Sequence, residues 1–262
     1  MNDALLSLLS QPLWVFLAVL ARVSPPLMMA PPTRSASVPM RIRAGIAIGL
    51  SVLIAPLAYG NASPMPQDLI NIVLGVTGEV ILGLMFGSII LLAVTSLQIA
   101  GQMVGNLAGL DLATSADPNT DEEMPVIANL LGWLAAAIFV VLGGHRQLLD
   151  CCMESFANFP VGTIQFRYSW LDELDAVIRH TFVIGIRSAA PLAVALLLSN
   201  LVAGLLARTL PQLNVLAIGF NINAMTLLTI LTLSIGGVAW VYQTELSVWL
   251  ESCHRIAQGG DS

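Results

Sequence analysis

The chain has 262 residues, of which 56% are hydrophobic and only 10% are charged, whereas about 25% are charged in a typical soluble domain. Its 10 basic and 16 acidic side chains cannot cover the surface of a soluble fold of this length. The composition excludes a disordered chain, a collagen-like fibre, a disulfide-stapled secreted domain and a basic nucleic-acid-binding protein. The sequence therefore predicts an all-α, polytopic membrane protein.

Six apolar blocks are predicted to form the helices, since a bilayer core of about 30 Å needs about 20 apolar residues in a helix. They are residues 4–21, 44–59, 69–110, 125–144, 177–207 and 213–250. The first block is interpreted as a retained span and not as a cleaved signal peptide, because it lacks a basic segment before it and a small-residue cleavage site after it. Pro25 and Pro26 are expected to end its helix, because proline has no backbone donor.

The third and sixth blocks are too long for one simple crossing of a bilayer. The third would extend about 60 Å as a single helix, so it must bend, protrude beyond the membrane or divide into two helices. The sixth contains 36 consecutive uncharged residues, 209–244. A polar segment, residues 111–123, follows the third block and has five acids and no base. Residues 145–176 form the most polar stretch and are expected at a membrane interface.

Sequence motifs give little support to catalysis. The chain has no HExxH or GxSxG motif and no phosphate-binding glycine loop. Cys151, Cys152 and Cys253 lack metal-ligand spacing, and a disulfide framework is not expected from them. We therefore expect neither a cofactor nor a metal.

Two charges lie deep in apolar blocks, the acid Glu79 and the base Arg187. Burying a charge within a membrane is costly and is usually tied to function. A transporter could use the two side chains as a substrate or proton pair. We favour an assembly role, in which they contact each other or polar groups of a partner subunit, because one such pair in six blocks is sparse for a proton relay.

Glycines recur at four-residue intervals in the apolar blocks, and this spacing leaves one face of a helix flat so that another backbone can approach closely. The repeats are Gly45/Gly49, Gly83/Gly87 and Gly101/Gly105/Gly109. They predict close helix packing, either within the chain or between chains.

Longer motifs carry a resemblance to a known family. In the central part they are Gly101-Gln102-Met103-Val104-Gly105, Gly109-Leu110-Asp111, Asp117-Pro118, Met124-Pro125-Val126, Phe139, Gly144-His145, Ser155-Phe156 and Phe159-Pro160-Val161-Gly162. A second block extends from Arg208 through Pro211-Gln212-Leu213-Asn214 to Ile218-Gly219-Phe220. In these motifs, and in length and hydropathy, the chain resembles the FliR/SctT family of type III export-gate membrane proteins. The family-motif positions singled out are His145, Pro211, Gln212, Asn214 and Gly219.

The resemblance implies long helical hairpins that pack into a conical assembly with FliP-like and FliQ-like subunits, together with FlhB-like and FlhA-like export components. Residues 1–176 would be the FliP-like portion, and 177–262 a FliQ-like helical hairpin with the C-terminal tail. The family also places a pore plug in the loop after the third block, which corresponds to residues 105–121. Its candidate residues are Leu107, Leu110, Asp111, Leu112, Ser115, Asp117 and Pro118. Relatives often have bulky aromatic residues there, where this chain has Leu112 and Ser115; without the resemblance, the segment reads as an ordinary acidic connection between helices.

The function that the resemblance implies is a non-enzymatic subunit of a flagellar export gate in the bacterial inner membrane. Unfolded flagellar proteins would pass through the shared channel, and no nucleic-acid partner is expected. An injectisome export-gate subunit is the close alternative. A free-standing small-molecule or ion transporter that uses Glu79 and Arg187 is an alternative of a different class, and an intramembrane enzyme is a weaker third.

Overall fold

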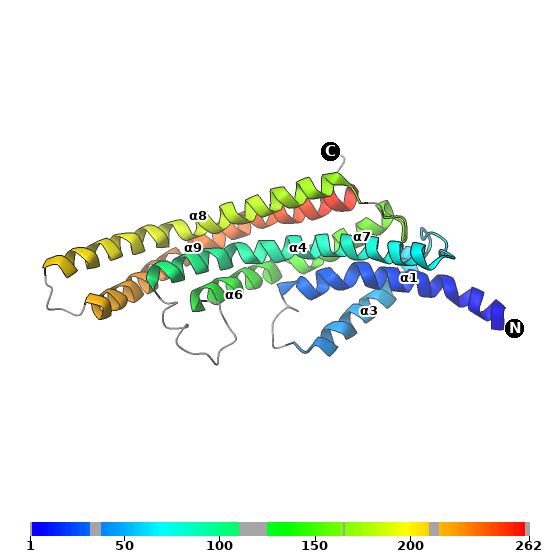
Figure 1. The fold of residues 1–262 in the computed structure, drawn as a ribbon, viewed down its shortest axis with the longest axis horizontal. Helices are drawn as coiled ribbons and strands as arrows, with labels where there is room; N and C mark the ends of the chain where they lie inside the picture. The colour runs from blue at the N-terminus through cyan, green and yellow to red at the C-terminus, as the bar shows by residue number, and fades with distance from the viewer. Residues whose placement is uncertain (1, 32–37, 110–124, 165, 210–214, 260–262) are drawn as a thin grey trace. The chain divides into compact units, whose positions relative to one another are not determined.

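The computed structural model describes residues 2–31, 38–109, 125–164, 166–209 and 215–259. Across these ranges the regular structure is helical throughout, as the sequence predicts (Figure 1). The helices are α1 (Asn2–Met29), α3 (Met40–Tyr59), α4 (Leu69–Ala108), α6 (Val126–Val141), α7 (Gly144–Asn158), α8 (Tyr168–Thr209) and α9 (Val215–Gln258). The expected all-α fold is confirmed.

The chain divides into two compact units that interleave along the sequence. Unit 1 comprises residues 1–92, 139–178 and 247–262, and unit 2 comprises residues 93–138 and 179–246. The long helices α4, α8 and α9 therefore contribute residues to both units. The boundary that the resemblance suggests, between residues 176 and 177, lies inside α8, and the FliP-like and FliQ-like division stays a prediction.

Helix α1 continues through Pro25 and Pro26, so the expected end before this diproline is wrong. The helix extends to Met29, and the N–H of Ala30 donates to the carbonyl of Pro26 over 3.0 Å. The prolines remove only the two donors that would bond the carbonyls one turn earlier. One of these carbonyls, that of Arg22, faces Gly83 of α4 so closely that a Cβ there would collide with it. Packing against α4 therefore covers one of the two carbonyls that lack a helical donor.

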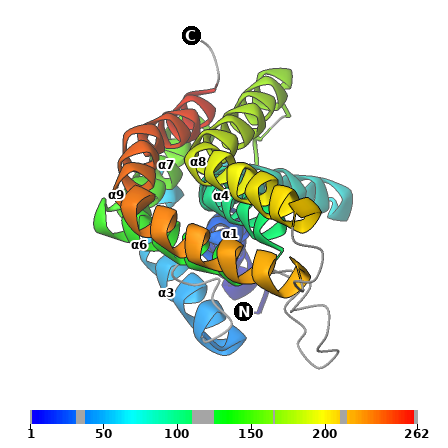
Figure 2. The ribbon, with the colours of Figure 1, turned by 90° about the vertical axis from the view of Figure 1, so that its left-hand side faces the viewer.

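The third apolar block forms a single helix, α4, of 40 residues. A straight helix of this length extends about 60 Å, about twice the thickness of a bilayer core. Helices α8 and α9 are similarly long, with 42 and 44 residues. In unit 2 their segments lie side by side (Figures 1 and 2). The polar stretch 145–176 contains most of α7 and the first turns of α8.

Five helices in the described parts of the chain are long and apolar enough to cross a membrane. A sixth crossing is possible by length and composition if α6 and α7 form one span, bent by 64° at their junction. Helix α8 leaves a run of apolar side chains more than half exposed: Phe182, Val183, Ile186, Val194, Leu197, Leu198, Leu201, Val202 and Leu205. Such a surface needs lipid or another protein to cover it. The fold is that of a multi-pass membrane protein.

Candidate functional site

A buried ion pair lies within unit 1. Nε of Arg22 in α1 lies 2.6 Å from Oε2 of Glu79 in α4, and both side chains are completely inaccessible to solvent. Arg22 also donates from Nη1 to Oγ of Ser155 in α7 at 3.1 Å, and from Nη2 to the carbonyl of Phe159 at 3.0 Å. The ring of Phe156 lies 4.0 Å from the centre of the guanidinium group. One arginine therefore joins α1 to α4, to α7 and to the segment that follows α7.

The other oxygen of Glu79 is also bound. Oε1 accepts a hydrogen bond of 2.9 Å from the backbone N–H of Gly162, and Gly162 adopts a positive φ of 81° that favours glycine. Ser63 also binds the segment that contains Gly162, because its hydroxyl and its N–H both donate to the carbonyl of Val161. Both carboxylate oxygens and all three guanidinium nitrogens thus make a hydrogen bond, either to each other or to partners in other segments.

A stripe of glycines on α4 lets the other segments come close enough to reach Glu79. Gly75, Gly83 and Gly87 share the four-residue spacing of Glu79, which places all four on one side of the helix. A Cβ at Gly75 would lie 2.9 Å from the ring of Trp14, and one at Gly87 would lie 2.7 Å from Sδ of Met29. The close packing predicted for Gly83 and Gly87 is therefore present within the chain. Gly45 and Gly49, by contrast, have nothing within 4 Å of such a Cβ.

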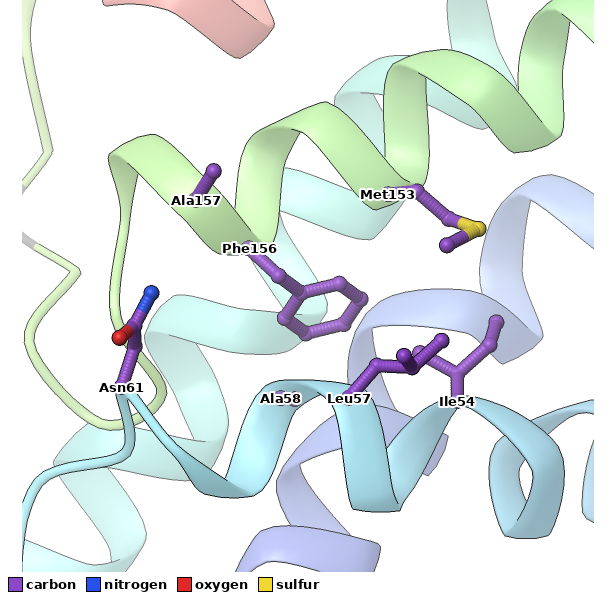
Figure 3. Close-up of a pocket in the computed structure, with 7 residues that line it drawn as sticks. All are labelled: Ile54, Leu57, Ala58, Asn61, Met153, Phe156 and Ala157. Carbon is purple, nitrogen blue, oxygen red and sulfur yellow. The ribbon is translucent and has the colours of Figure 1, made fainter.

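A small cavity lies between α3 and α7, and Phe156, whose ring lies against Arg22, is one of its lining residues (Figure 3). The cavity has a volume of about 130 Å³ and is lined by Ile54, Leu57, Ala58, Asn61, Met153, Phe156 and Ala157. None of these side chains is an acid, a base or a nucleophile. The cavity therefore provides packing around the arginine and no group that could carry out catalysis.

Arg187 has a different environment in unit 2. Its Nη1 lies 3.4 Å from Oε1 of Glu245, and its side chain is 60% exposed. The other carboxylate oxygen of Glu245 lies 3.5 Å from Nε2 of His180. Glu79 and Arg187, the two deep charges that the sequence singled out, thus have different partners, Arg22 and Glu245. Their roles in assembly stay a prediction.

The sequence reasoning missed Arg22, the residue that organises the buried cluster. It lies 57 positions before Glu79, and no local pattern links two residues at that separation. A weaker signal was present, because Arg22 stands between apolar residues one turn before a diproline. A charge in that setting must find a buried partner or reach the membrane surface.

The C-terminal part of α4 leads toward the candidate pore plug. Gly101 packs on α6, where a Cβ would collide with Cα of Ala128, and Gly105 is buried. Gly109 has a φ of 73° and donates its N–H to the carbonyl of Asn106 at 3.1 Å, so it ends the helix in the manner of a left-handed cap. Leu107 is half-buried in the last turn. The other plug candidates lie outside the described residues: Leu110, Asp111, Leu112, Ser115, Asp117 and Pro118.

The family-motif positions fall at dispersed places. His145 is exposed at the start of α7 and borders an apolar cavity of about 220 Å³ whose walls include Pro26 and Leu148. Gly219 lies near the start of α9, where a Cβ would make an ordinary contact of 3.8 Å with Ala203. Pro211, Gln212 and Asn214 lie outside the described residues.

Comparison with known proteins gives consistent matches over most of the chain. The family described as Bacterial export proteins, family 1, matches residues 13–248. The flagellar biosynthetic protein FliR of Escherichia coli K12 is 32% identical over 222 residues, which are 85% of this chain and 83% of the relative. FliR of Caulobacter vibrioides is 28% identical over 87% of this chain and 91% of its own. The Yop proteins translocation protein T of Yersinia pestis is 28% identical over 70% of each chain.

The apolar helices, the buried ion pair and the glycine-lined packing of α4 define a helical, multi-pass membrane protein whose charges hold segments together. With residues 13–248 matched, the chain belongs to the bacterial export proteins, family 1. The resemblance to the FliR/SctT family is thereby confirmed, and membership of this family makes the chain a component of a protein export apparatus.

Proposed function

We propose that the chain is a subunit of a flagellar export gate, through which unfolded flagellar proteins cross the inner membrane. The observation that carries this proposal is the similarity to flagellar relatives, which covers 85–87% of this chain for the two FliR proteins above. The similarity to the Yop proteins translocation protein T and to the secretion system apparatus protein SsaT covers 70% and 74% of the chain. The subunit would form a passage and leave the supply of energy to other components, so it would have no enzymatic activity.

The proposed partners are FliP-like and FliQ-like membrane subunits, with FlhB-like and FlhA-like components beside them. The exposed apolar side chains of α8 support a partner, because the helix extends about 63 Å and a bilayer core covers only about 30 Å of it. In this proposal residues 1–176 correspond to a FliP-like portion, and residues 177–262 to a FliQ-like hairpin and tail.

Residues 105–121 would form the seal of the pore. Support comes from the approach to this segment, in which Gly101 lets α4 pack tightly on α6. Leucines such as Leu107, Leu110 and Leu112 would close a narrow constriction by excluding water, because ions do not readily lose their hydration. Asp111 and Asp117 would face the wetter side or meet basic groups of partners.

Co-expression tests the assembly that this function requires. The full chain, produced with the FliP-like and FliQ-like proteins encoded in the same genome, should purify as one stable complex. Produced alone, it should aggregate or be degraded, because its apolar faces are uncovered. A monodisperse, protease-resistant protein obtained without partners in mild detergent would contradict the proposal.

An injectisome gate is the second candidate, since the Yop proteins translocation protein T of Yersinia pestis and the secretion system apparatus protein SsaT of Salmonella typhimurium are 28–29% identical to this chain. Deletion of the gene separates the two. Loss of flagellar filaments and swimming, restored by the gene on a plasmid, supports the flagellar role. Normal motility with loss of another secreted set of proteins would favour the injectisome.

A free-standing transporter based on Glu79 and Arg187 has less support. Both oxygens of Glu79 are engaged by Arg22 and Gly162, and the side chain is fully buried. A substrate or proton would have to displace one of these fixed donors to reach this buried carboxylate. Export that loses its dependence on the proton gradient in Glu79→Gln, with normal complex assembly, would restore the transporter interpretation.

A further inference from the structure

We infer that a relay of amide side chains on α8 and α9 anchors the last turn of α4, at the start of the proposed pore seal. The relay consists of Ser199, Asn200 and Asn223. Nδ2 of Asn200 donates to the carbonyl of Leu107 at 3.1 Å, and Nδ2 of Asn223 donates to Oδ1 of Asn200 at 2.6 Å. The hydroxyl of Ser199 donates to Oδ1 of Asn223 at 2.7 Å. The inference rests on the proposed function, because it assigns the residues that position the seal.

The backbone carbonyl of Leu107 fixes the direction of the whole relay. A carbonyl only accepts, so Asn200 must turn its NH₂ group toward Leu107 and its oxygen toward Asn223. Asn223 must then present its NH₂ group to Asn200, which leaves its own oxygen to accept from Ser199. All three hydrogen bonds point the same way, an arrangement in which each polarises the next. The relay is thus a single connected unit that ends on α4.

The end of α4 needs such a partner. Helix α4 ends at Ala108, so the carbonyl of Leu107 is one of the last four, which have no partner within a helix. An amide donor from α8 satisfies this carbonyl and opposes fraying of the final turn. The seal proposed for residues 105–121 would then begin from a fixed helix end.

The relay differs from two exposed threonines of α9. Thr229 and Thr232 of α9 bond the carbonyls four residues earlier in their own helix, which holds nothing else in place. Ser199 and Asn223 are buried, and both bond across helices. Polar groups between apolar helices contribute most when they bond a neighbouring helix, so these positions fit an anchoring role.

Hydrogen–deuterium exchange on the purified complex of the full chain with its FliP-like and FliQ-like partners tests the anchor directly. In Asn200→Ala, the backbone amides of residues 104–108 should exchange about fivefold faster, as expected for loss of one hydrogen bond. The matched control is Asn221→Ala, which removes an exposed asparagine of α9 two positions from Asn223 and should leave this exchange unchanged. Equal exchange in Asn200→Ala and the unaltered chain would overturn the inference.

The coupling between the two asparagines supplies a readout that a general packing defect would not produce. In the described part of the chain, the hydrogen bonds of Asn223 connect it to α4 through Asn200. Asn223→Ala should therefore accelerate the same amides, and the double variant should be no worse than Asn200→Ala alone. Additive effects would show two independent roles and would contradict the relay. If Asn200→Ala fails to assemble, Asn200→Asp keeps the size and the acceptor but removes the donor in its ionised form, and the same acceleration is expected.

Ion conductance separates failure of the anchor from failure of the proposed seal. Deleting residues 109–119 tests the seal, and it should raise the leak of small ions through complexes in planar bilayers. Asn200→Ala should raise it to a smaller extent. The first decisive outcome is a leak after the deletion, with unchanged leak and unchanged hydrogen exchange in Asn200→Ala. It would overturn the anchor but would support the seal. No leak after the deletion, with faster exchange in Asn200→Ala, overturns the seal and shows that the relay only fixes α4.

Discussion

The two compact units use an arginine–carboxylate pair in opposite ways. In unit 1, Arg22 and Glu79 are completely buried, lie 2.6 Å apart and are surrounded by further hydrogen bonds. In unit 2, Arg187 is 60% exposed and lies 3.4 Å from Glu245. The first pair is enclosed by the chain itself, whereas the second joins α8 to α9 beside apolar side chains of α8 that are exposed. An arginine–carboxylate pair therefore joins helices in the interior of unit 1, and a pair of the same type lies at the surface of unit 2.

This contrast follows from the residues that surround each pair. Around Glu79, a stripe of glycines on α4 allows α1 to approach so closely that Arg22 and Glu79 are in direct contact and fully buried. Around Arg187, the neighbouring Phe182, Val183 and Ile186 keep the surface broad and apolar. The buried pair should therefore determine whether unit 1 folds, and the exposed pair should matter chiefly to what covers unit 2. The predictions below test this difference, beginning with the largest effect.

Glu79→Gln should give the largest loss. The substitution leaves the positive charge of Arg22 buried without a counter-charge, and breaking a buried pair from one side typically costs about 3–5 kcal/mol. The thermal denaturation midpoint and the yield of the co-expressed complex measure the effect. The matched control, Arg187→Gln, removes a charge of the other pair and should lower the midpoint far less.

Removing both charges sharpens this test. Arg22→Gln combined with Glu79→Gln replaces the ion pair by two amides that can still bond each other, so part of the lost stability should return. A double variant that is as unstable as the sum of its two single variants would show that the charges act independently, and the idea of one cooperative cluster would be wrong.

Gly83→Ala should have the next largest effect. Its Cβ would collide with the carbonyl of Arg22, so α1 and α4 must move apart and loosen the ion pair, at a cost of about 1–3 kcal/mol. The control is Gly49→Ala, in α3, where a Cβ meets nothing within 4 Å and alanine is the better helix former. Complex yield and protease resistance should fall for Gly83→Ala and stay level or rise for Gly49→Ala.

The sequence predicts much of this fold because length and apolar content are strong constraints. Blocks of 16 or more apolar residues can only be satisfied as helices in a bilayer or against partners, and each predicted block is helical over most of its length. The failure at Pro25 and Pro26 has a physical cause, since the packing of Gly83 against Arg22 makes the loss of two helical hydrogen bonds tolerable. The low helix propensity of proline was thus overridden by tertiary contacts.

The candidate site was predictable only in part. Glu79 could be chosen because it is a lone acid in a long apolar block, and Gly83 and Gly87 because of their spacing. Glu79 continues that spacing together with Gly75, so the four could have been read as one face of α4. Arg22, Ser155 and the backbone groups of Phe159 and Gly162 come from distant parts of the chain. Their meeting depends on how the helices pack, which no local pattern encodes.

Arg187→Gln should have the smallest effect on the chain itself and the most specific effect on its partners. An ion pair that is more than half exposed on one side contributes about 0–1 kcal/mol, so the secondary structure and protease resistance of the chain should hardly change. Within an assembly, however, the side chain of Arg187 would be covered along with the apolar surface around it, and a covered charge needs a partner. A lower yield of the co-expressed complex, with the protease resistance of the assembled fraction unchanged, is therefore expected.

Glu245→Gln, which removes the intrachain partner, separates a role of Arg187 within the chain from a role between subunits. It should leave Arg187 available to other subunits and should lower the yield less than Arg187→Gln does. If Glu245→Gln costs as much yield, the exposed pair acts within the chain, and the contrast between the two units would be one of degree only.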